Sequence, residues 1–110
     1  MRNLTRKSRF YPAERSWTKT PAWAFEVPLT FIEASPPSTR ITLLCQNPTD
    51  RDSFLVLEVP VAFLKERQAD FFVREDHMSI SLFLSAVASD RFTDLRGSGK
   101  VPFRPFLVRK

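Results

Sequence analysis

Cysteine, histidine and glycine are scarce in this sequence of 110 residues, which holds one cysteine, one histidine and two glycines. The single cysteine, Cys45, excludes an internal disulfide and a cysteine-rich zinc site. His77 stands alone without a ligand-spacing motif, so it does not predict a metal site. No apolar run approaches the roughly 20 residues that a membrane-spanning helix needs. The basic N-terminal segment is not followed by an apolar run either, so we expect no secretory signal and a cytoplasmic location.

Phenylalanine and proline are abundant instead, with 11 and 9 residues. The chain length fits one domain that is large enough to bury a hydrophobic core. Apolar residues make up 43% of the sequence, which is near the norm for globular proteins and argues against wholesale disorder. The composition therefore predicts one small, folded, basic domain.

Charge falls into three blocks along the chain. Residues 1–20 and residues 91–110 each carry six basic residues against one acidic residue, a net charge of +5 for each block. Residues 21–90 carry five basic against ten acidic residues, a net charge of −5. This asymmetry indicates an anionic partner, although basic ends can also fold back on an acidic middle. We interpret residues 1–20 as a basic arm and residues 21–110 as a single globular domain with a basic C-terminal segment.

Alternation of apolar and polar residues predicts four strands. Period 2 over residues 23–31 indicates a half-buried strand, and Pro28 predicts that this strand lies at the edge of a sheet or bends at that point. Residues 41–46 and 54–59 predict a hairpin across a seven-residue loop, with its second strand covered on both faces. Residues 78–85 alternate large apolar residues with serines and predict the fourth strand.

One helix is expected after Pro60, whose fixed φ suits a first helical turn. Apolar residues at steps of three and four predict about 12 helical residues from Val61 to Phe72. The order of elements predicts an α+β fold, a small and mostly antiparallel sheet of about four strands with one helix packed on a face. A small phenylalanine-lined barrel is the alternative.

Basic and aromatic residues are interleaved at both ends of the chain. Cationic groups neutralise phosphates, and aromatic faces stack on unpaired bases. This mixture predicts a small non-enzymatic nucleic-acid-binding module that contacts phosphates through its terminal segments. The predicted contact residues are Arg2, Arg6, Lys7, Arg9, Tyr11, Arg15, Trp17, Lys19, Arg96, Lys100, Arg104, Arg109 and Lys110. Other aromatic residues of the C-terminal block, such as Phe92 and Phe106, fit a buried core at least as well.

Residues 96–100, Arg-Gly-Ser-Gly-Lys, contain part of the pattern of a phosphate-binding loop. A P-loop requires glycine where Asp94 stands and serine or threonine where Val101 stands. A plain surface turn is therefore the favoured interpretation. Its two glycines could still expose backbone N–H groups beside Arg96 and Lys100.

A protein-interaction or assembly subunit is the alternative function. The excess of phenylalanine, the predicted edge strand and the opposed charge blocks suit a homo-oligomer or a component of a larger complex. The basic ends would then contact an acidic protein surface in place of nucleic acid.

An enzyme is the third hypothesis. Asp50, Asp52 and Glu58, with Lys65, are the residue types of a metal-dependent nuclease, but the two aspartates lie in a predicted turn. Cys45 falls in an apolar strand, where a buried and inert thiol is expected, and a catalytic Cys–His pair is neither supported nor excluded. The sequence assigns no catalytic residue, metal or cofactor, and it favours a non-enzymatic role.

Overall fold

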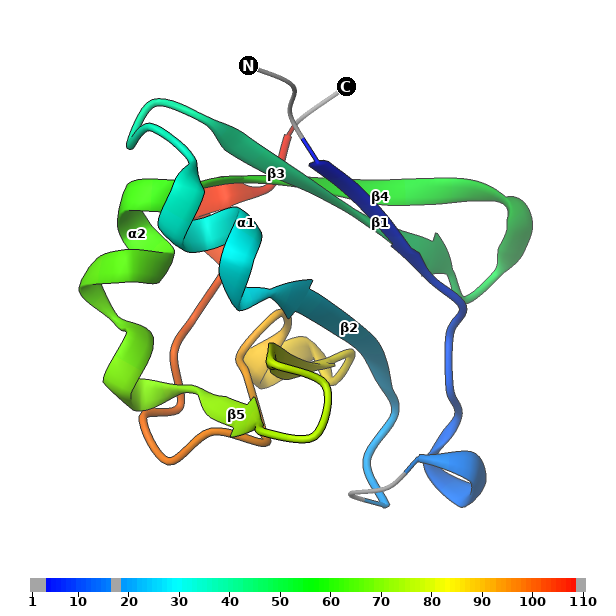
Figure 1. Ribbon diagram of the computed structural model, residues 1–110. Helices are drawn as coiled ribbons and strands as arrows, with labels where there is room; N and C mark the ends of the chain where they lie inside the picture. Colours follow the sequence, from blue (N-terminus) through cyan, green and yellow to red (C-terminus); the bar gives the residue numbers. More distant parts are fainter. Residues whose placement is uncertain (1–3, 17–18, 109–110) are drawn as a thin grey trace.

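Two three-stranded β-sheets and two short helices make up the computed structural model, which describes residues 4–16 and 19–108 (Figure 1). The first sheet has the order β1-β3-β4 and comprises β1 (Leu4–Ser8), β3 (Arg40–Asn47) and β4 (Asp50–Pro60). The second has the order β2-β6-β5 and comprises β2 (Ala22–Pro28), β6 (Ser79–Ser85) and β5 (Phe72–Arg74). The helices are α1 (Leu29–Ala34) and α2 (Val61–Glu66). Short 3-10 turns are η1 (Ala13–Arg15), η2 (Gln68–Asp70), η3 (Ala88–Asp90) and η4 (Arg104–Phe106).

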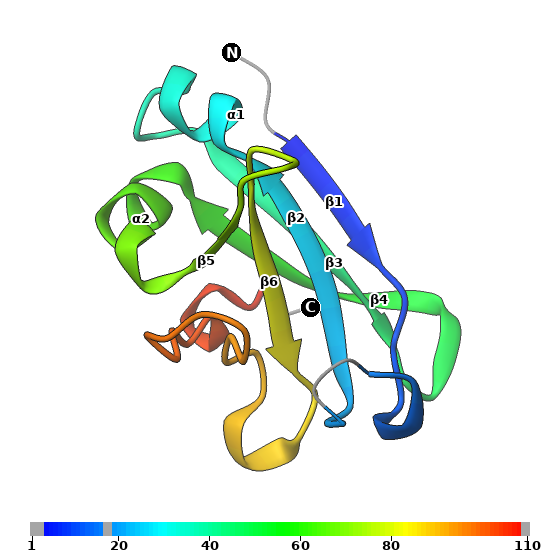
Figure 2. The same ribbon diagram turned by 60° about the horizontal axis from the view of Figure 1, so that its bottom comes forward.

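The two sheets meet where β1 approaches β2 (Figure 2). The backbone N–H of Ala24 donates to the Ser8 hydroxyl at 2.9 Å. Three residues further along, Tyr11 and Ala22 exchange backbone hydrogen bonds at 2.9 and 3.0 Å. Strand β2 lies at the edge of its sheet, as expected, because its sheet has the order β2-β6-β5. The first half of its outer edge is nevertheless occupied by Ser8 and Tyr11.

Alternate residues of the strands face a common core between the sheets. The largest fully buried side chains include Trp23 of β2, Leu43 of β3, Leu57 of β4 and Leu82 of β6. Helices α1 and α2 pack against each other at one end of the molecule (Figure 1). Neither helix has the length and apolar character needed to cross a membrane, within the part of the chain that the structure describes.

The α+β class is confirmed, but the single sheet of about four strands is not. The described residues form six strands in two sheets, and this arrangement does not confirm the barrel alternative. The arm expected over residues 1–20 is not confirmed either, because Leu4–Ser8 pairs in parallel with β3. The less exposed positions of β1 are Leu4, Arg6 and Ser8, of which only Leu4 is apolar, so this strand carries little of the apolar pattern that predicts a strand.

The predicted strand over residues 23–31 ends early. Pro28 stands at the N-cap of α1, and the chain continues as a helix that buries Leu29 and Ile32. Leu29 and Phe31 continue the alternation of β2 only by coincidence. In the helix the buried residues are Leu29 and Ile32, which share one face because they stand at positions i and i+3. The helix was therefore missed.

The hairpin of β3 and β4 is confirmed, but its loop is shorter than expected. Asn47 pairs with Asp50, so a tight turn replaces the seven-residue loop. Strand β4 is not covered on both faces, because Phe54 and Val56 remain partly exposed. Its outer edge instead accepts a hydrogen bond from the backbone N–H of Val108 to the carbonyl of Val56 at 2.8 Å.

The predicted helix begins after Pro60 as expected but is half as long. It ends at Glu66, and the chain then forms η2 and the short strand β5, which was not predicted. The strand of alternating serines is confirmed as β6. Its serines are packed rather than solvated, since Ser79, Ser81 and Ser85 are all buried.

Candidate nucleic-acid interface

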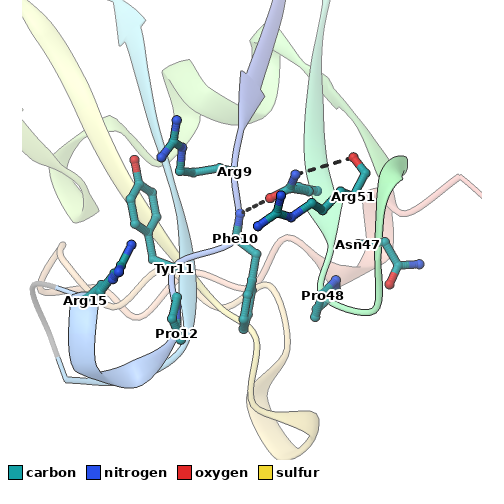
Figure 3. Close-up of a pocket in the computed structure, with 9 residues that line it drawn as sticks. Arg9, Phe10, Tyr11, Pro12, Arg15, Asn47, Pro48 and Arg51 are labelled. Carbon is teal, nitrogen blue, oxygen red and sulfur yellow. Dashed lines mark hydrogen bonds between the residues drawn. The ribbon is translucent and has the colours of Figure 1, made fainter.

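A cavity of about 810 Å³ lies between the segment after β1 and the β3–β4 hairpin (Figure 3). The volume is within the range typical of ligand pockets. Arginines account for three of its lining residues, and no lining residue is acidic. We call it the arginine cavity, and it is lined by Arg9, Phe10, Tyr11, Pro12, Arg15, Gln46, Asn47, Pro48 and Arg51.

Gln46 holds the two walls of the arginine cavity together. Its side-chain Oε1 accepts a hydrogen bond from the backbone N–H of Phe10 at 2.9 Å. Its Nε2 donates to the backbone carbonyl of Arg51 at 3.4 Å, and both bonds are drawn in Figure 3. One glutamine on β3 thus joins the N-terminal segment to the hairpin.

Aromatic packing anchors the segment around Phe10, which lines the arginine cavity on its N-terminal side. The Phe10 ring meets Trp23 edge-on, with the ring centroids 6.1 Å apart. Trp23 in turn stacks on Phe92 at 5.3 Å, and both residues are fully buried. The backbone of Arg9 and Tyr11, on either side of Phe10, is therefore anchored to the core.

The arginine cavity holds positive charge that no ion pair among the described residues neutralises. None of its three arginines forms an ion pair with any described residue. The described ion pairs lie elsewhere, and they join Arg67 to Asp70, Arg74 to Glu26 and to Asp76, and His77 to Asp76. The acidic residues next to the cavity arginines in sequence do not line the cavity. Asp50, for example, caps the hairpin turn by accepting the backbone N–H of Asp52 at 3.0 Å.

The structure gathers only some of the predicted N-terminal contact residues. Arg9, Tyr11 and Arg15 meet in the arginine cavity, and in the view of Figure 3 the Tyr11 ring lies between the two arginines. Lys7 is exposed on β1, and its ammonium lies 5.4 Å from the centroid of the Phe54 ring. Arg6 and Lys19 are described but do not line the cavity. The predicted residues Arg2, Trp17, Arg109 and Lys110 lie outside the described residues.

The predicted C-terminal residues do not join this cavity. The Arg96 guanidinium lies over the Phe72 ring at 4.3 Å and near the Phe83 ring at 5.5 Å. Lys100 is exposed in the same loop, and Arg104 is exposed at the start of η4. The described basic residues of the two ends therefore do not line a common cavity.

Most of the backbone N–H groups of residues 96–100 that were expected to be exposed donate hydrogen bonds within the protein. The Asp94 carboxylate accepts the N–H groups of Phe83, Arg96 and Gly97 at 3.0, 3.2 and 3.0 Å. The N–H of Gly99 donates to a backbone carbonyl, that of Asp70, at 3.1 Å. The expectation that this loop exposes N–H groups beside its basic residues is therefore wrong for Arg96, Gly97 and Gly99. Burial raises the pKa of Asp94, and the three N–H donors oppose that shift.

The residues proposed for a nuclease do not converge. Asp50 and Asp52 lie at the hairpin turn, whereas Glu58 lies further along β4, opposite Thr42. Lys65 donates to the backbone carbonyl of Ser35 at 3.2 Å. Among residues 4–16 and 19–108, no three His, Cys, Asp or Glu side chains are placed to hold a metal ion.

The lone cysteine and the lone histidine lie in different environments. Cys45 is fully buried, as expected, and burial raises the pKa of its thiol. His77 is exposed in the turn before β6, with its Nδ1 3.6 Å from Asp76.

Sequence reasoning missed Arg51 and Gln46. Their positions depend on the parallel pairing of β1 with β3, which brings Ser8 beside Cys45 and so places the next residues beside the hairpin. The sequence matches no protein-family model, no curated protein and no solved structure.

Proposed function

We propose that this protein is a small nucleic-acid-binding module that holds a single strand at the arginine cavity. The observation that carries the proposal is that Arg9, Arg15 and Arg51 line one cavity together with Tyr11, and that none of the three forms an ion pair with any described residue. Guanidinium groups bind phosphate oxygens with paired hydrogen bonds. An aromatic ring among them offers a face on which an unpaired base stacks.

The concave shape favours a single strand over a duplex. Proteins that read duplex DNA insert a projecting helix or β-ribbon into a groove. The cationic groups here surround a recess of about 810 Å³ instead. A recess of this kind admits a flexible strand whose bases are unpaired, so phosphates and a base can be contacted together.

The proposed role is binding without catalysis. Cys45 is buried in the core and Lys65 is hydrogen-bonded to Ser35, so two candidate reactive groups are occupied structurally. A cytoplasmic location belongs to the same proposal, and cell fractionation would test it.

Fluorescence anisotropy with a labelled single-stranded oligonucleotide tests the proposal. The variants Arg9→Gln, Arg15→Gln and Arg51→Gln each remove one cavity charge, and we expect each to weaken binding about tenfold, equal to ~1.4 kcal/mol. The control is Arg91→Gln, an equal charge change at an exposed residue outside the cavity. Wild-type protein that binds no oligonucleotide at low salt would overturn the proposal. Equal losses in all four variants would show that only net charge matters.

Assembly with another protein is the second candidate, and exposed apolar groups favour it. Phe72 and Met78 are 41% and 58% exposed. Leu44, Phe54 and Val56 lie partly exposed on the outer face of the first sheet. Light scattering separates the two candidates. A monomer that binds oligonucleotide supports the first, and a stable oligomer that ignores nucleic acid supports the second.

A further inference from the structure

A second, smaller cavity of about 180 Å³ adjoins the arginine cavity and shares Tyr11 and Arg15 with it. Its other described lining residues come mainly from β2 and β6. They are Ser16, Ala22, Trp23, Ala24 and Phe83.

The register of the strands gives this cavity the form of a slot. Tyr11 forms a bridge with Ala22 on one side of β2, and Phe83 pairs with Ala24 on the other side. Residues directly opposite each other in antiparallel pairs project to the same face. The two small alanines therefore form a floor, and the two aromatic side chains rise from the segments that flank β2. These segments lie roughly 9.6 Å apart by the usual strand spacing, and Phe83 stands two residues further along β2 than Tyr11. We call this cavity the alanine slot.

We propose that the alanine slot receives one pyrimidine base of the bound strand, while the adjacent phosphate lies among the arginines of the larger cavity. This inference rests on the proposed function. An apolar protein cavity of about 150 Å³ holds a benzene molecule. A slot of about 180 Å³ therefore has room for a single six-membered ring, whereas a purine adds a fused second ring.

Arg15 and Tyr11 make the two cavities one site. Arg15 lines both, so its guanidinium can bind the phosphate next to the base in the slot. Tyr11 separates the cationic recess from the alanine floor and offers a ring face to the base. Stacking alone tolerates any base, so the selection comes from the size of the slot.

The first test uses the wild-type protein and three labelled single strands of equal length. They are an oligothymidine, an oligoadenosine, and the oligothymidine with its central bases removed to leave abasic sugars. We expect the oligothymidine to bind about tenfold more tightly than either of the others. Because runs of adenosine stack on themselves, cytidine and adenosine 5′-monophosphates are also compared as competitors, and the cytidine nucleotide should compete better.

The second test fills the slot. Ala24→Leu places a larger side chain on its floor and should abolish the preference for thymidine while leaving salt-dependent binding in place. The matched control is Ala62→Leu, at an exposed alanine of α2. If Ala24→Leu does not fold, the abasic strand still decides the question, because that comparison needs no variant.

The outcomes separate the two proposals. Equal affinity for the three strands, or a preference for adenosine, overturns the pyrimidine slot and leaves the arginine cavity as a phosphate site. Failure to bind any strand overturns the proposed function itself.

Discussion

The indole Nε1 of Trp23 donates a hydrogen bond to the backbone carbonyl of Gln46, 2.8 Å away. Trp23 is only 1% exposed and stacks on Phe92, so this bond joins the centre of the core to the strand that supports the arginine cavity. The side chain of Gln46 extends the connection to both cavity walls. The arginines are therefore carried on backbone that the core positions, and a change at Gln46 should alter both stability and binding.

Gln46→Leu removes the two side-chain hydrogen bonds while keeping a side chain of similar size. The N–H of Phe10 is then left without its partner, and we expect the free energy of unfolding to fall by about 1–3 kcal/mol. Oligonucleotide affinity should fall as well, because the two walls are no longer joined. Urea denaturation and anisotropy measure the two effects.

A second substitution at the same position separates the effect of charge from the effect of the Gln46 hydrogen bonds that join the two cavity walls. Gln46→Glu keeps an acceptor for the N–H of Phe10 but adds a negative charge among the arginines. The free energy of oligonucleotide binding should therefore be reduced more than the free energy of unfolding. The control is Gln68→Leu in η2, which does not line the cavity. Unchanged oligonucleotide affinity in both Gln46 variants would contradict the role of Gln46 in joining the two cavity walls.

The salt dependence of binding should report the number of cavity arginines that meet phosphates. On a single strand the slope of log K against log salt is about −0.7 for each phosphate neutralised, so three contacts predict a slope of roughly −2. Arg51→Gln should make the slope shallower by about 0.7, and Arg91→Gln should leave it unchanged. Anisotropy titrations at several salt concentrations measure it. A slope near zero for the wild type would remove the phosphate mechanism.

Strands with a clear alternation of residue types could be predicted from the sequence, and the others could not. Strand β3 alternates because every second side chain enters the core. Strand β6 alternates large apolar residues with small serines, although both of its faces are buried. Strand β1 is held by parallel backbone pairing, and it could not be predicted because its less exposed positions include the polar residues Arg6 and Ser8. Helix α1 was hidden for the opposite reason, since its apolar residues happen to extend the alternation of β2.

The candidate site could also be predicted only in part, because local residue patterns reveal some of its residues and long-range strand pairing brings in the others. The basic and aromatic pattern picked out Arg9, Tyr11 and Arg15, which the cavity does bring together. Arg51 is about 40 residues away along the chain, at the start of β4 and in a segment of ordinary composition, so only the pairing of β1 with β3 reveals it. The prediction that both charged ends act together was reasonable from charge alone, but charge blocks contain no information about which loops converge.

Gly97 is required by close packing and not by its backbone conformation. Neither glycine has a positive φ. A Cβ at Gly97 would contact the backbone carbonyl of Asp70 and would lie 2.8 Å from the Asp94 carboxylate and 2.9 Å from the Cα of Phe71. Gly97→Ala should therefore lower the free energy of unfolding by about 1–3 kcal/mol, measured by urea denaturation.

The neighbouring residue supplies the control for that prediction. Ser98 is exposed, so Ser98→Ala should leave stability unchanged within about 0.5 kcal/mol. If Gly97→Ala were as stable as the wild type, the loop would have to move away from η2 at little cost, and the packing argument would be wrong.

Glu26 should make the stability of the protein depend on pH in the acid range. Burial raises the pKa of Glu26, but hydrogen bonds from Ser79 at 2.9 Å and Arg74 at 2.5 Å, with the charge of Arg74, hold it below the ordinary value of 4.5. A carboxylate whose pKa is lowered by folding stabilises the folded state above its unfolded pKa. That contribution is lost as the pH falls through the folded pKa. The stability difference between wild type and Glu26→Gln should therefore be constant above about pH 4.5 and should shrink below it. Urea denaturation across the acid range measures this difference, with Glu33→Gln, an exposed substitution on α1, as the control. A difference that stays constant or widens on acidification would show that the ion pair with Arg74 does not favour the ionised carboxylate.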